Sequence, residues 1–210
     1  MTSSDVCRDA IEQTHAVYRA NYGALSSRGY HVMYGPPKLN APILFIGYQP
    51  GGDHRTSDHL FEKPAVFWPE ISYYATEPWR LAVNLRNMFG HEILRESTGL
   101  NAIFFRSPNI KTYNSEVPRQ IRRELAAFSV TQARRIVDAL TPKLVVGIGF
   151  DSLRLFGPTS PALISSKGRV LAENGFVGSR PAIGVLHLSG AQISNIDRAE
   201  IAQFVIAGMV

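Results

Sequence analysis

Cysteine is the scarcest reactive residue in the sequence, and long apolar runs and low-complexity tracts are missing from it. The single cysteine, Cys7, excludes an internal disulfide, a zinc site built from cysteines and a protein-bound iron–sulfur cluster. No apolar run approaches about 18 residues and no secretory signal is present, so we expect no membrane partner and a cytoplasmic location. At 210 residues, 45% of them hydrophobic, the chain suits one domain over residues 1–210 with a three-layer core.

Basic residues outnumber acidic ones, and the excess lies in one segment. The formal net charge is +5 and the pI is about 9.5. Between residues 106 and 143, eight Lys and Arg residues stand against three acids, so this segment alone accounts for the excess. Arg119, Arg123 and Arg134 fall on the side of a predicted helix opposite its apolar face. This pattern fits a polyanionic partner such as DNA, with a solvated basic surface as the alternative.

The first predicted strand covers residues 43–46 and ends in a turn with few side chains. Its continuous apolar run is typical of a strand buried on both faces, and Gly47 and Pro50-Gly51-Gly52 interrupt it. Such a turn lets a ligand approach main-chain N–H groups, although a tight strand-to-helix connection has the same composition. Neither G-x-G-x-x-G nor a Gly-Lys-Ser/Thr loop is present, so we expect no bound nucleotide and no cofactor.

The remaining predicted elements alternate between helix and strand. Helices are expected at residues 3–22, 78–89, 118–140, 151–157 and 195–209, with a break near Ser129 left open. Further strands are expected at 101–106, 143–149 and 181–189, and residues 158–180 as a loop or weak hairpin. Four apolar strands among helices predict an α/β fold, a three-layer α/β/α arrangement around a central four-stranded parallel sheet.

The parallel order of these strands brings several polar groups to one rim of the sheet. Gln49 follows the first strand, Asn101 or Arg106 belongs to the second, and His187 lies at the end of the fourth beside Ser189. Ligands bind at the carboxyl ends of parallel strands, so this rim is the predicted site.

The stretch from residue 53 to 78 is rich in aromatic residues and predicts either a loop over a pocket or plain packing anchors. His54 and His59, with Asp53 and Asp58, have the chemistry of metal ligands. Their spacing matches no metal-binding pattern, so we expect no metal.

In order and spacing, the motifs between residues 40 and 195 resemble those of the uracil-DNA glycosylase superfamily. Residues 47–51, Gly-Tyr-Gln-Pro-Gly, are similar to its first-strand motif, and Phe61 follows Gln49 by 12 residues, as the base-stacking Phe of the family does. Residues 101–106 resemble the strand that carries an Asn, 144–149 resemble the strand that ends in Gly, and 187–189 resemble the closing His-Pro-Ser motif.

The resemblance implies excision of uracil, or a related damaged base, from DNA by base flipping. Phe61 would stack on the base, Asn101 would read its edge, and His187 would donate to the O2 of the departing base. Gln49 or Asp53 would bind and orient the attacking water. The resemblance also implies a monomer without metal that binds the substrate through Tyr48, Pro50, Gly51 and Ser189. DNA contacts would come from Arg106, Lys111, Arg119, Arg123, Gly190 and Gln192.

Two departures from the family pattern bear on activity. Gln49 stands where the most active members have Asp, and an amide can orient water but cannot take its proton. Leu188 replaces the Pro that follows the motif His. A binder of abasic or damaged DNA, with little or no turnover, is therefore the alternative function. A hydrolase or nucleotide-binding protein unrelated to DNA is a third, disfavoured because a Ser nucleophile elbow and phosphate motifs are lacking.

Overall fold

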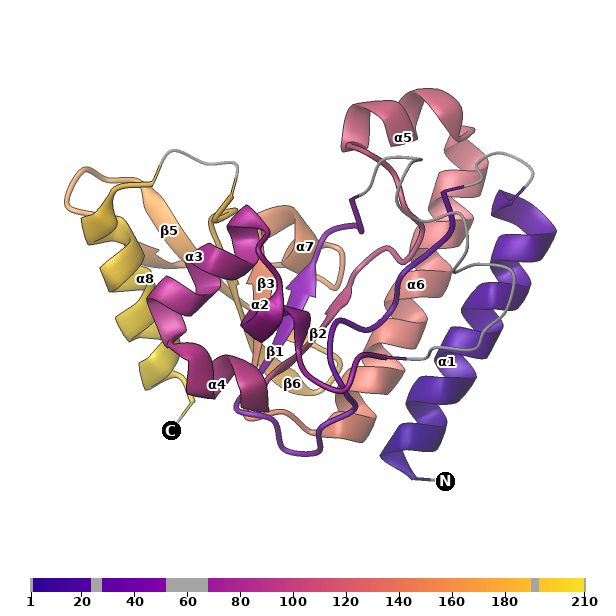
Figure 1. Cartoon of the computed structure of the whole chain (residues 1–210). Helices are drawn as coiled ribbons and strands as arrows, with labels where there is room; N and C mark the ends of the chain where they lie inside the picture. Colours follow the sequence, from indigo (N-terminus) through magenta and orange to yellow (C-terminus); the bar gives the residue numbers. More distant parts are fainter. Residues whose placement is uncertain (1, 24–27, 52–67, 190–192, 210) are drawn as a thin grey trace.

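The computed structural model describes residues 2–23, 28–51, 68–189 and 193–209 (Figure 1). Its helical elements are α1 (Ser3–Val17), the π-helix η1 (Tyr18–Tyr22), α2 (Tyr73–Thr76), α3 (Arg80–Phe89), α4 (His91–Glu96), α5 (Ile110–Glu116), α6 (Arg119–Leu140), α7 (Phe150–Arg154) and α8 (Asn195–Ala207). Its strands are β1 (Ile43–Gly47), β2 (Thr98–Asn101), β3 (Leu144–Ile148), β4 (Ser160–Ile164), β5 (Val170–Val177) and β6 (Arg180–Val185). The α/β class expected from the sequence is confirmed.

The strands form one six-stranded mixed sheet in the order β2-β1-β3-β6-β5-β4. β2, β1, β3 and β6 pair in parallel, and β5 and β4 extend the sheet in antiparallel pairing. The four predicted strands therefore do run parallel to one another, but the sheet is six-stranded and mixed because β5 and β4 add two antiparallel strands. For residues 158–180 the hairpin alternative is the correct one, because β4 and β5 pair antiparallel. Glu173, Asn174 and Gly175 interrupt the apolar residues of β5, whereas Leu153 of α7 packs directly over Gly175.

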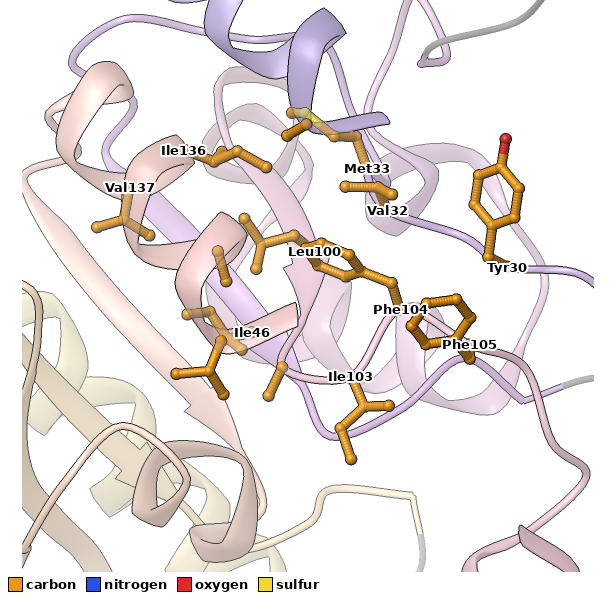
Figure 2. Packing of buried hydrophobic residues seen from close by; sticks show 14 of the residues in the cluster. Tyr30, Val32, Met33, Ile46, Leu100, Ile103, Phe104, Phe105, Ile136 and Val137 are labelled. Atoms are coloured by element: carbon orange, nitrogen blue, oxygen red, sulfur yellow. The ribbon is translucent and has the colours of Figure 1, made fainter. Parts of the chain in front are cut away.

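Helices cover both faces of the sheet and give the three layers (Figure 1). Leu44 and Ile46 of β1 face the cluster built with α1 and α6, whereas Ile43 and Phe45 face the cluster built with α3, α4 and α8. Alternate residues of one strand are thus buried on opposite sides, which explains its continuous apolar run. Figure 2 shows part of the first cluster, in which Ile46 and Leu100 of the sheet lie beside Ile136 and Val137 of α6.

The second strand lies earlier than the sequence predicts. β2 covers Thr98–Asn101, so Asn101 ends the strand instead of opening it. Gly99 hid the strand signal, and it is required because a Cβ there would lie 2.4 Å from the Tyr74 ring. The apolar residues 102–105 continue past the strand into the core of Figure 2. There the N–H groups of Ala102 and Ile103 donate to Gly47 O and Tyr48 O.

Thr2 caps α1 through a reciprocal capping box with Asp5. α6 runs unbroken through Ser129, whose Oγ donates to Leu125 O and accepts from the N–H of Phe104. This serine therefore joins the helix to the segment after β2. None of the helices described is both long enough and apolar enough to cross a membrane.

Candidate functional site

A cavity of about 430 Å³ lies where the parallel strands end, and we call it the rim cavity. Each of the four parallel strands contributes to it, through the turn after β1, the end of β2, the end of β3 and the chain after β6. Its walls are Tyr34, Gly47, Tyr48, Gln49, Gly51, Tyr74, Trp79, Leu81, Asn101, Ser107, Pro108, Asn109, Ile110, Ile148, His187 and Ser189. The structure thus brings together Gln49, Asn101 and His187, the three strand-end residues singled out in the sequence.

Asn101 is held tightly in the wall of the rim cavity. It is 3% exposed, and it pairs in register with Gly47 on the neighbouring strand. A Cβ at Gly47 would lie 2.6 Å from Asn101 Oδ1, so only glycine leaves room for this carboxamide. Asn101 Nδ2 lies 3.5 Å from His31 O. Because this carbonyl oxygen is an acceptor, it fixes which side of the carboxamide carries the nitrogen. The amide therefore offers one fixed donor and acceptor pattern.

Gln49 is fixed by the segment that follows β2. Its Nε2 donates to Phe105 O at 2.9 Å, which leaves Oε1 as the acceptor available to a ligand or water. The same segment also fastens the turn, because Ser107 N–H donates to the carbonyl of the buried Pro50 at 3.1 Å. Tyr22 of η1 supports this segment from behind, with its hydroxyl 2.6 Å from Arg106 O.

His187 lies two residues beyond β6 and faces both the rim cavity and a second cavity. Ser189 Oγ is 3.1 Å from its Nδ1. The residue is exposed overall, yet its ring packs on Gly149, where a Cβ would lie 3.4 Å from Cδ2. This partial desolvation lowers the pKa of His187 below its ordinary value, so the imidazole is neutral at pH 7.

Aromatic rings form one wall of the rim cavity. Tyr34 and Tyr74 stack at 5.8 Å between centroids with an 11° angle, and Trp79 meets both rings edge-on. Burial raises the pKa of Tyr34, although a hydrogen bond with Asn101 opposes this effect. Tyr34 was not predicted as a site residue because it lies between the expected helix over residues 3–22 and the expected strand over 43–46, in a segment without a local pattern. The signal was non-local, an antiparallel bridge between Met33 and Leu100.

Arg106 lies beside the turn after β1. It is half-buried, with one guanidinium nitrogen 3.5 Å from Gly51 O and the other 3.5 Å from His31 Nδ1. Burial, and then the positive charge of Arg106, lower the pKa of His31 to about 3. His31 is therefore a neutral acceptor for Arg106, and this pair supports the turn after β1.

The predicted basic face is only partly retained. Lys111, Arg119 and Arg123 are exposed on α5 and the first turns of α6, the end of that helix near the carboxyl rim (Figure 1). Arg134 lies about 22 Å from Arg119 along the axis of α6. It donates to Phe156 O at 2.7 Å, so it belongs to the packing of α6 on the chain after α7.

Four predicted site residues, Asp53, Phe61, Gly190 and Gln192, lie outside the described residues, as do His54, Asp58 and His59. Of the other turn residues, Tyr48 and Gly51 line the rim cavity. Within the described ranges, no group of three or more His, Cys, Asp or Glu residues is arranged to hold a metal ion.

No protein-family model matches this sequence, and no curated protein matches it. The resemblance of the motifs to uracil-DNA glycosylases is therefore supported only by the residues of this chain and the way they are arranged.

Proposed function

We propose that this chain is a uracil-DNA glycosylase-like enzyme, a single domain over residues 1–210 that hydrolyses the N-glycosidic bond of uracil or a related damaged base in DNA. The proposal rests on one observation. Asn101, Gln49 and His187 line the same cavity, and Lys111, Arg119 and Arg123 are exposed at the same end of the molecule. Action as a monomer in the cytoplasm, without metal or cofactor, belongs to the same proposal.

Asn101 selects the base in this mechanism. A flipped uracil presents N3–H as a donor and O4 as an acceptor, which match the Oδ1 and Nδ2 of a fixed carboxamide. Cytosine presents the opposite pattern there and would leave buried polar groups unpaired, which is the strongest basis of discrimination. The close packing of Asn101 on Gly47 supports this role, because a rotating amide would not discriminate.

His187 acts on the leaving group. Breaking the bond between C1′ and N1 leaves a cationic sugar and a uracil anion whose charge gathers on O2. Ser189 Oγ lies 3.1 Å from His187 Nδ1. In this mechanism the hydroxyl donates to Nδ1, so that the neutral ring carries its proton on Nε2 and donates it as a hydrogen bond to O2. One well-placed donor of this kind contributes about 3 kcal/mol to transition-state stabilisation.

Gln49 positions the water that completes the hydrolysis. Its Nε2 is committed to Phe105 O, so Oε1 is the atom that accepts a hydrogen bond from water. The hydroxyl of the water adds to C1′ and its proton ends on the released base. An amide leaves the water neutral, which suffices because the sugar cation is already a strong electrophile.

The test uses labelled oligonucleotides that contain uracil, cytosine or an abasic site. We expect alkali-sensitive cleavage at uracil and none at cytosine, and His187→Ala should abolish most of the cleavage at uracil. Cleavage at no modified base under single-turnover conditions would contradict the proposal.

A second candidate is a binder of abasic or damaged DNA that turns over slowly or not at all. Gln49 in place of an acid favours it, because no described group at the β1 turn takes the proton of the water. A gel shift on the abasic oligonucleotide without cleavage at uracil would select this function.

A further inference from the structure

A second cavity of about 330 Å³ adjoins the rim cavity around the start of α7. The two cavities share a ridge made of Tyr48, Ile110, Ile148 and His187, because these residues line both. The two cavities are therefore direct neighbours.

The second cavity is lined by one carboxylate, that of Asp151, and by Arg154. Its Arg154 binds Glu173 at 2.5 Å and Asp151 at 3.4 Å, so one guanidinium serves two carboxylates. The Asp151 side chain is 73% exposed, whereas that of Glu173 is 7% exposed. A phosphate would meet the Asp151 carboxylate and be repelled. An uncharged group with N–H donors is favoured in its place.

The lining of the second cavity suits a flat ring. Phe150 and Tyr48 are partly exposed and line it, and the Arg154 guanidinium lies 5.4 Å from the centroid of the Phe150 ring. Ile148 and Leu186 add apolar surface. Aromatic side chains beside a hydrogen-bond acceptor are the chemistry by which proteins hold a nucleobase.

From the shared ridge, the charge and the lining, we infer that the second cavity binds the base adjacent to the one in the rim cavity, and that Asp151 selects its identity. This inference rests on the proposed function of the rim cavity. The two sites would hold consecutive nucleotides of one strand, with Tyr48 and His187 between them.

Asp151 favours guanine among the four bases. Guanine presents N1–H and N2–H₂ side by side, which match the two oxygens of a carboxylate. Thymine presents a single N–H between two carbonyl oxygens, which face the carboxylate with like charge. A good bidentate pair discriminates by roughly tenfold or more. In duplex DNA this edge is already paired, so the preference is greatest on single strands.

The experiment measures single-turnover excision and equilibrium binding on uracil-containing single strands, with each of the four bases placed on the 5′ side and then on the 3′ side of uracil. The wild-type chain should prefer guanine over thymine roughly tenfold on one flank only. Asp151→Asn should bring that ratio to about one, because a carboxamide pairs with thymine as well as with guanine. Asp138→Asn is the matched control, since this exposed carboxylate of α6 lines neither cavity, and the ratio should be unchanged.

The two proposals fail in different ways. If uracil is excised at the same rate whichever bases flank it, the second-base site is wrong, whereas the glycosylase proposal is unaffected. A guanine preference that persists in Asp151→Asn would equally overturn the inference. Binding with a guanine preference but no excision would support the second-base site and remove the glycosylase.

Discussion

At the scale of single residues, glycines of the sheet make the site possible. Gly47 gives room to Asn101, and Gly99 gives room to Tyr74. Each side chain occupies the space that a Cβ would fill on the neighbouring segment, so its position is fixed by backbone and not by a flexible contact.

The pair Gly47 and Asn101 allows a sharp test by a double-mutant cycle. Gly47→Ala should destabilise the protein by about 1–3 kcal/mol, because the added methyl group meets Asn101 Oδ1. In an Asn101→Ala background the same change should cost clearly less, since the obstructing oxygen is gone. Urea unfolding of the four proteins measures both costs. Equal costs in the two backgrounds would show that Asn101 does not occupy this space.

The residues proposed to be catalytic should differ in how much they contribute to the rate of excision. We expect His187→Ala to slow single-turnover excision of uracil by on the order of a hundredfold or more, because His187 acts on the charge that develops in the leaving base. Gln49→Ala should cost less, since this amide only positions water. Gln49→Asp should raise the rate by placing a charge near the sugar cation. If His187→Ala excised uracil at the wild-type rate, His187 would have no part in the mechanism.

Asn101→Asp should lose uracil excision and gain action on cytosine, because a carboxylate accepts from the cytosine amino group. The same single-turnover assay on cytosine-containing oligonucleotides measures this exchange. Undiminished uracil excision would show that another residue reads the base. The stacking role of Phe61 and the water-handling role of Asp53 stay predictions of the sequence.

At the scale of elements, α6 separates two kinds of arginine. Its first turns present Arg119 and Arg123 at the rim, near Lys111 of α5, whereas its later arginines are engaged in packing and ion pairs. Only part of the basic segment is therefore exposed at the rim.

Salt dependence of DNA binding tests this division. Changing Lys111, Arg119 and Arg123 to Gln should reduce the slope of log K against log salt by up to about three units, because each phosphate contact contributes roughly 0.9. The control changes Lys143 and Arg95, exposed cations at the opposite ends of the strands, and its slope should equal that of the wild type. A slope unaffected by the triple change would mean that these cations are merely solvated.

At the scale of the whole molecule, burial of His31 links stability to pH. Its pKa is about 3 in the folded chain, below the ordinary value of 6.5. The unfolded chain therefore binds a proton first as the pH falls, and the contribution of neutral His31 to stability declines between pH 6.5 and about 3.

Comparison of wild type with His31→Phe isolates this effect from other titrating groups. Between pH 6.5 and pH 5, the wild type should lose up to about 2 kcal/mol more than the variant, at roughly 1.4 kcal/mol per pH unit. Urea unfolding at the two pH values gives both losses. Parallel losses in the two proteins would assign the acid sensitivity to other groups.

The sequence predicted those parts of the fold whose signals are local. The apolar runs of β1, β3 and β6 are continuous because both faces of the sheet are covered, and their ends correctly placed Gln49 and His187 at one rim. β2 was misplaced because its Gly99, which leaves room for the Tyr74 ring, weakens the apolar pattern. β4 and β5 were expected only as one of two alternatives, a loop or a weak hairpin, because polar residues and a glycine interrupt β5. The aromatic wall was missed because contacts distant in sequence create it.

The place of β6 within the sheet has a consequence for local opening. β6 pairs with β3 on one side and β5 on the other, and Leu186 N–H still donates to Leu171 O one residue before His187. Amides bonded within the centre of a sheet exchange their hydrogens with solvent only when the whole domain unfolds. The β6 amides should therefore exchange as slowly as global unfolding allows, and His187 should keep its place in destabilised variants for as long as the domain remains folded.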